Sequence, residues 1–453
     1  MIAEYHELLS RKTSKDWVNQ QSVECVPHPL AKPHQSHCLH KLLGIQRGAA
    51  FLDTGLGKTF LQVDWARHIP GKVLILAPLA VAQQTQHEAK SLMGIDIGRS
   101  SDGTADTQIT VTNYERAHLF DTSEFAGVVL DESSILKGQS SKMRAYLTSA
   151  FAMTPWKLCC TATPAPNDHT ELGNHAEFLG IMSAQEMLTR WFIHDSANTA
   201  DWRLKGHAEE SFWEWVGSWA ACVSMPSDLG YSDEGYKLPQ LDIDTHTVAS
   251  PLLEGDEGEL FGMPSVSATD LHATKRKTIN ERCELVADLV NSSSEPWIVW
   301  CESNAESELL AKLIPDAVEV KGADSIDRKE DRLNSFTVGA SRVLISKPSI
   351  CGFGMNWQHC RNMAFASISY SYESFYQAVR RSWRFGQTKP VKVHVCIADA
   401  ELPVWRTIER KATDHETMKK GMRMASGSSE SHQTKIKYNP TKNINLPAWL
   451  QTS

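Results

Sequence analysis

The sequence predicts an α/β protein with two lobes, each built on a parallel β-sheet, and a mainly helical segment between them. Short apolar or β-branched runs, bounded by turn residues, recur along the chain and alternate with polar stretches of helical length. This alternation is typical of parallel sheets connected by crossover helices. The chain has 453 residues, which is more than one compact core usually holds. Two lobes therefore fit its length better than one.

The predicted strands fall into two sets, one in each half of the chain. The first set covers 48–52, 72–78, 109–115, 127–132 and 157–163, and the second covers 296–301, 317–322, 342–346, 362–368 and 391–398. Right-handed crossovers would place the C-terminal ends of the strands, and the motifs that follow them, at one edge of each sheet. We therefore expect a first lobe at 1–170 and a second lobe at 268–415.

The remaining two segments differ in composition. Residues 171–267 form the expected helical segment, which is rich in tryptophan: Trp191, Trp202, Trp213, Trp215 and Trp219. These side chains could stack on nucleic-acid bases, but the spacing of Phe212, Trp215 and Trp219 favours a helical core. Residues 416–453 end in ASGSSESHQTKIKYNPTKN, a composition that predicts a flexible tail.

The composition, 41% hydrophobic and 22% charged, is ordinary for a soluble globular protein. No apolar run reaches the roughly 18 residues that span a bilayer. The N-terminus lacks the charged start and apolar stretch of a secretory signal. The ten cysteines form no CxxC pair, and we interpret them as reduced and mostly buried. We therefore expect a cytoplasmic protein without a membrane contact.

Residues 25–40 contain two cysteines and four histidines, which raises the alternative of a zinc site. A structural zinc site usually takes two well-spaced ligand pairs, and only Cys25 and His28 have that spacing. We interpret this segment as a polar loop.

The motif DTGLGKT, directly after the first predicted strand, predicts a phosphate-binding loop. Such a loop needs glycines, so that successive backbone N–H groups can point at phosphate oxygens. It also needs a lysine for the β and γ oxygens and a hydroxyl for Mg²⁺. Gly55, Gly57, Lys58 and Thr59 supply these groups, although the strict pattern has glycine where this chain has Leu52. The motif predicts ATP and Mg²⁺ as cofactors.

Two acidic residues, Asp131 and Glu132, end the predicted strand at 127–132. A carboxylate at this place can hold the Mg²⁺ that Thr59 also binds, while its neighbour orients or deprotonates the attacking water. The alternative is a solvated acidic turn. The presence of a phosphate loop in the same lobe favours the catalytic interpretation.

The second half contains QAVRRSWRFGQ, in which Arg381 and Arg384 are three residues apart. A helix would present both guanidinium groups on one face. Guanidinium groups stay charged and bind phosphoryl oxygens in pairs, which suits them to a transferring γ-phosphoryl group. Taken alone, such a cluster is more often a basic surface or nucleic-acid patch.

Read in order, these motifs resemble those of the superfamily-two helicases, and within them the Swi/Snf-type double-stranded DNA translocases. The resemblance covers about 30–170 and 270–415. It includes KPHQ, DTGLGKT, APLAVAQQ, VTNYE, LDESSILKG, TATP, VKGADSIDRKEDRLNSF, CGFGMNW and QAVRRSWRFGQTKPV. It implies two RecA-like lobes with a nucleotide between them, and a cleft that closes and opens with each hydrolysis cycle.

The resemblance also implies roles for individual residues. The catalytic set is Lys58, Asp131, Glu132, Gln377, Arg381 and Arg384. The nucleotide-binding set is Gln35, Gly55, Leu56, Gly57, Lys58, Thr59 and Gly354, with Thr59 and Asp131 as Mg²⁺ ligands. The nucleic-acid-binding set is Thr112, Tyr114, Lys137, Thr161, Thr163 and Gly352.

The chain departs from the family pattern at three places. Ser134 stands where a histidine usually follows the acidic pair, and Thr85 stands where a tryptophan is common. The segment before LPQL, at 238–241, lacks the usual paired arginines. The build without accessory domains suggests a bacterial or bacteriophage protein.

We therefore expect a monomeric, DNA-dependent ATPase of the DEAD/DEAH-like helicase type that moves along double-stranded DNA. The net charge of −8 and the isoelectric point near 6.1 argue mildly against a nucleic-acid partner. In a large motor, however, the charge that matters is local to the cleft. The alternatives are a helicase of the same fold that acts on RNA or single strands, and an ATP-gated interaction module with impaired motor activity.

Overall fold

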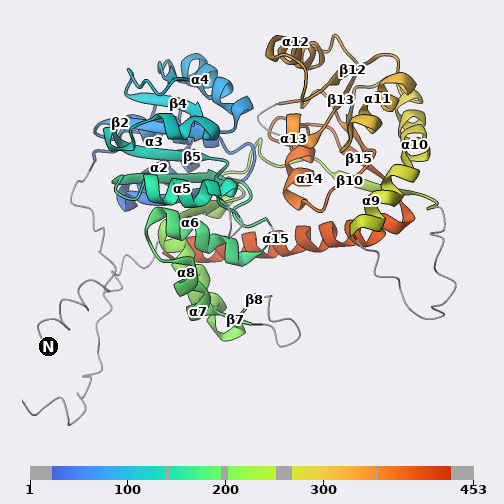
Figure 1. Cartoon of the computed structure of the whole chain (residues 1–453). Coiled ribbons are helices and arrows are strands. Elements are labelled where there is room, and N and C mark those ends of the chain that lie inside the picture. Colours follow the sequence, from blue (N-terminus) through green and yellow to red (C-terminus); the bar gives the residue numbers. More distant parts are fainter. Residues whose placement is uncertain are drawn as a thin grey trace, which may run out of the picture.

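The structure is a computed structural model that describes residues 23–137, 142–166, 168–194, 202–250, 268–351 and 356–429. It is an α/β protein with two parallel sheets, as the sequence predicts. Figure 1 shows two lobes side by side, with the long helix α15 (Leu402–Ser429) running beneath both. We call the described part of 23–229 the first lobe and that of 241–401 the second lobe.

The first lobe contains a sheet with the strand order β3–β4–β2–β5–β6–β1–β9, in which every pair is parallel. The strands are β1 (Arg47–Leu52), β2 (Lys72–Ala77), β3 (Gly98–Arg99), β4 (Ile109–Asn113), β5 (Phe125–Asp131), β6 (Trp156–Thr161) and β9 (Ala220–Val223). The five strands predicted for the first half are therefore present. Because β6 lies between β1 and β5, the loops after these three strands leave the same edge side by side.

Helices cover this sheet and extend below it. They are α2 (Pro33–Ile45), α3 (Lys58–Arg67), α4 (Leu79–Met93), α5 (Lys142–Ala150), α6 (Leu172–Leu179), α7 (Ala184–Trp191) and α8 (Glu209–Trp219). The antiparallel pair β7 (Phe192–His194) and β8 (Trp202–Leu204) follows α7. β1 and β6 are buried along their whole length, as expected for central strands covered on both faces.

The second lobe contains a parallel sheet with the strand order β10–β15–β14–β11–β13–β12. The strands are β10 (Leu241–Val248), β11 (Trp297–Trp300), β12 (Ala317–Val320), β13 (Val343–Ser346), β14 (Asn362–Phe365) and β15 (Val391–Ala398). The helices are α9 (Ala268–Lys277), α10 (Ile279–Asn291), α11 (Asn304–Leu313), α12 (Ile326–Thr337), α13 (Pro348–Cys351) and α14 (Tyr372–Val379). The five strands predicted for the second half are also present.

The expected separate segment at 171–267 instead supplies parts of both lobes. β9 pairs with β1 in the first sheet, and β10 pairs with β15 in the second. Trp213 and Trp219 are buried in the core of the first lobe, and Trp215 is packed against that core. This confirms the helical-core interpretation of these tryptophans over base stacking.

Helix α15 connects the cores of the two lobes. Near its start, Trp405 and Ile408 are buried in the core of the second lobe. Met418 and Met422, further along the helix, are buried with the tryptophans of the first lobe. The helix therefore includes 416–429, the start of the segment for which the sequence predicted a flexible tail.

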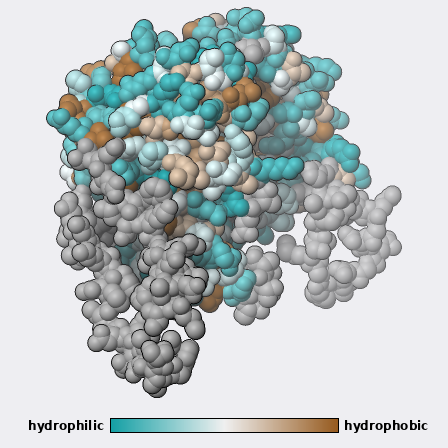
Figure 2. Space-filling view, turned by 60° about the vertical axis from the view of Figure 1, so that its left-hand side comes forward, coloured by the Kyte–Doolittle hydropathy of each residue, from teal (hydrophilic) through white to brown (hydrophobic). Residues whose placement is uncertain are grey.

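The surface is predominantly hydrophilic on the face that Figure 2 shows, with hydrophobic residues scattered over it. Among the described residues, no helix combines the length and the apolar character needed to cross a membrane.

Gly421 provides a test of the contact between α15 and the first lobe. Alanine usually stabilises a helix relative to glycine by about 1 kcal/mol. Here, however, a Cβ at Gly421 would lie 2.5 Å from Nε1 of the rigid Trp213 indole. We therefore expect Gly421→Ala to lower the midpoint of thermal unfolding, measured by circular dichroism. The control is Gly44→Ala in α2, where a Cβ would meet nothing within 4 Å, and which should not lower it. A stabilised Gly421→Ala would mean that α15 does not dock as described.

Candidate active site

The segment between β1 and α3 has the geometry of a phosphate-binding loop. Gly55 and Gly57 have φ angles of +95° and +83°, in the left-handed region that glycine adopts without strain. α3 begins at Lys58, and the Lys58 ammonium lies 3.4 Å from the Leu52 carbonyl oxygen, so this side chain folds back over the loop. The backbone N–H groups at such a helix start form a favourable place for an anion.

Gln35 and His34, at the start of α2, hold this loop from outside. The Gln35 Nε2 donates to the Leu56 carbonyl at 3.0 Å, and His34 Nε2 lies 3.3 Å from the same oxygen. A Cβ at Gly57 would collide with the Gln35 amide, so only glycine permits this approach. Burial lowers the pKa of His34, which favours a neutral ring that donates through Nε2. The sequence assigned Gln35 to the nucleotide, and the structure places it directly against the phosphate loop.

The other side chains of the suspected zinc segment are dispersed. His28 Nε2 lies 3.2 Å from the Met93 carbonyl oxygen, and Cys38 is buried in the core. Within the described residues, no three potential metal ligands of the His, Cys, Asp and Glu types come together.

Asp131 ends β5 as a buried carboxylate beside Glu132. Gln62 of α3 donates to Asp131 Oδ1 at 2.6 Å, and the Glu132 N–H donates to the same oxygen at 3.1 Å. Burial and the Glu132 carboxylate raise the pKa of Asp131, while Gln62 and the charge of Lys58 oppose this rise. Lys58 therefore lies within electrostatic reach of Asp131.

Glu132 has a φ of +53°, a left-handed conformation that is unusual for a residue with a side chain. Such strain persists only where the surroundings enforce it, and it is concentrated at functional sites. Thr161, at the end of β6, donates to Glu132 Oε2 at 3.3 Å. The next residue, Ser133, lies 3.1 Å from the buried His175 Nε2. Burial lowers the pKa of His175 to about 4, so its neutral ring accepts from the Ser133 hydroxyl.

The second lobe brings the segment that contains Arg381 and Arg384 to the interface with the first lobe. Arg381 is buried and donates to the Gln377 carbonyl at 2.9 Å and to the Gln377 side-chain oxygen at 3.0 Å. Burial and Arg384 lower the pKa of Arg381 to about 9, while the negative charge of Glu132 opposes this shift. Burial lowers the pKa of Arg384 to about 10. Arg381 is thus within reach of the charge of Glu132 across the lobes.

The phosphate loop itself also contacts the second lobe. A Cβ at Gly55 would lie 2.6 Å from the Phe385 Cβ, so the arginine motif packs directly on the loop. Asp53 accepts from the Tyr376 hydroxyl at 2.8 Å and from the Lys419 ammonium at 2.9 Å. Arg380 NH2 lies 3.9 Å from the same carboxylate. We call these four residues, Asp53, Tyr376, Arg380 and Lys419, the Asp53 cluster.

In this buried cluster, two cations surround the one carboxylate of Asp53. Burial alone would raise the pKa of Asp53, but Lys419 and Arg380 outweigh burial and lower it to about 2. No local sequence pattern marks Tyr376, Arg380 and Lys419 as partners of the loop. The only available signal was the acidic residue that opens the motif, because its partners come from distant parts of the chain.

Among the buried polar atoms that lack a hydrogen-bond partner within the described structure, two bear on a ligand at the interface. They are the Thr54 hydroxyl in the phosphate loop and Nε2 of Gln377 in the second lobe. Buried polar groups are normally paired, so such atoms point to a ligand or water that completes them. A nucleotide phosphate offers suitable acceptors. Mg²⁺ would need few protein ligands here, since it takes most of its oxygens from phosphate and water, and Thr59 and Asp131 fit that demand.

The predicted nucleic-acid residues lie differently from what the sequence suggested. Thr112, Tyr114, Thr161 and Thr163 are buried. The Thr112 hydroxyl donates to the Ser100 carbonyl at 2.9 Å, and the Tyr114 hydroxyl donates to the Asp131 carbonyl at 2.6 Å. Thr112 and Tyr114 therefore bond to the interior of the first lobe, whereas the Thr163 hydroxyl donates to Glu373 of the second lobe. Lys137 forms an ion pair with Glu373 of the second lobe. Gly352 and Gly354 lie outside the described residues.

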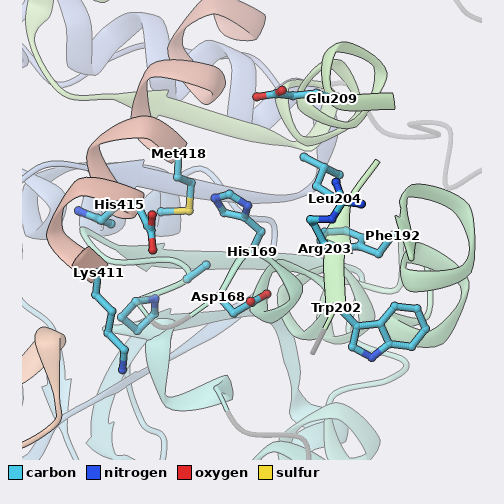
Figure 3. A pocket seen from close by; sticks show the side chains of 13 residues that line it. Asp168, His169, Phe192, Trp202, Arg203, Leu204, Glu209, Lys411, His415 and Met418 are labelled. Carbon is cyan, nitrogen blue, oxygen red and sulfur yellow. The ribbon is translucent and has the colours of Figure 1, made fainter. Parts of the chain in front are cut away.

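A separate cavity of about 330 Å³ lies between the segment after TATP, strand β8 and α15. In Figure 3, His169, Arg203 and Trp202 line one part of it, and Lys411 and Met418 of α15 line another. None of the predicted site residues lines this cavity.

In comparisons with protein-family models and with curated proteins, the chain matches none. The assignment of a function therefore rests on the residues and their geometry.

Asp131→Asn should raise the midpoint of thermal unfolding of the ligand-free protein at pH 8. The folded state holds the pKa of Asp131 above its ordinary value of 3.8, so ionisation of this carboxylate destabilises the fold. This destabilisation is absent when the pH is below the ordinary pKa of Asp131. It grows as the pH rises from there to the pKa of Asp131 in the folded state, and it is constant at higher pH. Calorimetry between pH 5 and 8 should show the advantage of the variant widening with pH.

The matched control is Asp106→Asn, a change at an exposed aspartate, which should leave the midpoint unchanged. A lower midpoint for Asp131→Asn would mean that the folded state stabilises the ionised carboxylate.

Proposed function

We propose that this protein is an ATP-hydrolysing motor with two RecA-like lobes, and that it translocates along double-stranded DNA. One observation carries the proposal: the helix that begins at Lys58 bonds Asp131 through Gln62, and the segment that contains Arg381 and Arg384 packs on the phosphate loop from the other lobe, through Phe385. Taken alone, the acidic pair could be a solvated turn and the arginine cluster a basic surface patch. Their convergence from three distant parts of the chain supports one shared reaction.

The first lobe would bind ATP and align the attacking water. Lys58 would contact the β and γ oxygens, and Thr59 and Asp131 would hold Mg²⁺, which supplies charge neutralisation to the phosphates when bound. Glu132 would orient the water and accept its proton. Its strained backbone fixes the direction of the carboxylate, and Thr161 holds one of the carboxylate oxygens.

The second lobe would supply charge for the transition state. Arg381 is held by Gln377 and feels the charge of Glu132, and closure of the lobes would bring it to a transferring phosphoryl group. An arginine finger contributes ~10³–10⁵-fold to turnover in enzymes of this chemistry. Hydrolysis would therefore depend on contact between the lobes, and a track bound across both lobes would stimulate it by favouring the closed state.

The substitution at Ser134 is compatible with this mechanism. In the family pattern, the histidine at this position links the acidic pair to the TATP segment. Here Glu132 contacts Thr161 of that segment directly. The link from the hydrolytic residue to the rest of the lobe therefore does not require a histidine at 134.

The DNA track is supported by the ordered motif set rather than by an exposed contact surface. The resemblance favours duplex DNA over RNA and single strands, a sequence-tolerant contact to the backbone, a monomeric state and a cytoplasmic location. The RNA helicase and the ATP-gated interaction module remain the outcomes that the experiments below would distinguish.

Two variants test the hydrolytic assignments. Lys58→Ala should abolish hydrolysis and weaken nucleotide binding, because the triphosphate loses its direct cation. Glu132→Gln should bind ATP nearly normally but turn over on the order of 10²–10⁴-fold more slowly, since it loses the general base. Phosphate release and binding of a fluorescent ATP analogue measure the two effects. Glu115→Gln, a change at an exposed residue of the same lobe, is the control. Full activity of Glu132→Gln would remove the role assigned to that residue.

The track is tested by comparing nucleic acids. Duplex DNA should stimulate the ATPase more than single-stranded DNA or duplex RNA, and the protein should displace a triplex-forming strand with little unwinding of a forked duplex. The slope of log K against log salt should be about −4 to −5, as expected if roughly five phosphates are neutralised. Robust unwinding of a forked duplex without triplex displacement would favour a true helicase. Stimulation by RNA alone would favour the RNA-helicase alternative, and ATP binding without any stimulation would favour the interaction module.

A further inference from the structure

Glu373 is a buried carboxylate of the second lobe that is bound entirely by the first lobe. It lies on α14, and 5% of the residue is exposed. Oε2 forms an ion pair with the Lys137 ammonium, and Oε1 accepts from the Thr163 hydroxyl at 3.5 Å. A buried carboxylate is costly unless it is paired, so this contact strongly favours one relative position of the lobes.

The partners of Glu373 are connected by hydrogen bonds and by the chain with Glu132, the proposed hydrolytic residue. The Thr163 N–H donates to the Thr161 hydroxyl oxygen at 3.1 Å, and that hydroxyl donates to Glu132 Oε2 at 3.3 Å. Lys137 lies in the loop that follows the acidic pair, five residues after Glu132. Glu373 is thus connected with Glu132 in two ways. One runs through Thr163 and Thr161, and the other through the loop that contains Lys137.

Glu373 also shares a helix with the arginine-holding residue. Positions 373 and 377 are one helical turn apart, so the two side chains lie on the same side of α14. Gln377 in turn holds Arg381, whose pKa is influenced by the charge of Glu132. Docking of Glu373 therefore sets the position of the helix from which Arg381 reaches the site.

We propose that Glu373 is a positioning residue that couples contact between the lobes to hydrolysis, by holding the Lys137 loop and the Thr163–Thr161–Glu132 chain in register with Arg381. This inference rests on the proposed ATPase function. Glu373 touches neither nucleotide nor water in this role. It differs from the Asp53 cluster, which contacts the phosphate loop, because Glu373 contacts the segments that hold the water-orienting carboxylate.

The first experiment separates turnover from binding. Glu373→Gln keeps an acceptor for Thr163 but removes the charge that pairs with Lys137. We expect kcat of the full-length protein with saturating duplex DNA to fall about 10-fold, the range seen when supporting residues of a reactive centre are changed. KM for ATP should stay nearly constant, because the phosphate loop is untouched. The matched control is Glu330→Gln on α12, an exposed residue of the same lobe, which should change neither constant.

The second experiment reverses the ion pair. Lys137→Glu and Glu373→Lys should each lower kcat, and the double variant should recover a substantial part of it, since the pair is restored with opposite polarity. The same four proteins, melted without nucleotide, should show non-additive shifts of the unfolding midpoint. Additive melts together with no recovery of kcat would overturn the inference, because they would show that the two side chains act independently.

The outcomes separate the inference from the proposed function. A wild-type protein that hydrolyses no ATP with any nucleic acid would overturn the proposed function, and the coupling role would fall with it. An active wild type with unchanged kcat in Glu373→Gln would overturn the coupling role alone. An altered KM for ATP at unchanged kcat would also overturn it, because Glu373 would then act on nucleotide binding.

Discussion

The arrangement of the two lobes depends on the carboxylate of Asp53. This side chain opens the phosphate loop, yet the groups that bind it come from α14 and from α15, far along the chain. Burying a carboxylate is costly, and the cations of Arg380 and Lys419 offset that cost only when both helices are docked. Such buried ionic groups define geometry more than they add net stability. The conformation of the phosphate loop and the position of the second lobe are therefore set together.

Local sequence patterns were sufficient to predict the class of fold and the central strands, because β-branched runs between turn residues depend little on distant contacts. Three edge strands were missed, of which β3 has only two residues. β9 follows a tryptophan-rich helix without a turn, and β10 lies in a segment that was interpreted as part of an insertion. The alternation in LDIDTHTV was a strand signal for β10. In α15, the spacing of Met418 and Met422 was a signal that the helix continues with a buried face.

The conformation of the loop between β1 and α3 was predictable, because one short motif contains its own geometry. The phosphate loop needs only its glycines, its lysine and the strand and helix beside it. The partners of Asp53 and Glu373 could not be found in this way, because they depend on how two separately wound sheets dock. The predicted nucleic-acid residues illustrate a related limit, since a motif marks a segment and not the direction of its side chains. Thr112 and Tyr114 belong to the expected segment but bond to the protein interior.

The length of α15 has a mechanical consequence. Its 28 residues form a rod of about 42 Å, anchored in the second lobe by Trp405 and in the first by Met418 and Met422. A helix anchored at both ends resists stretching. Moving the lobes apart along its axis would therefore expose Met418 and Met422, which are buried in the core of the first lobe. Helix α15 therefore limits how far the two lobes can move apart along its axis, whatever else changes at the interface between them.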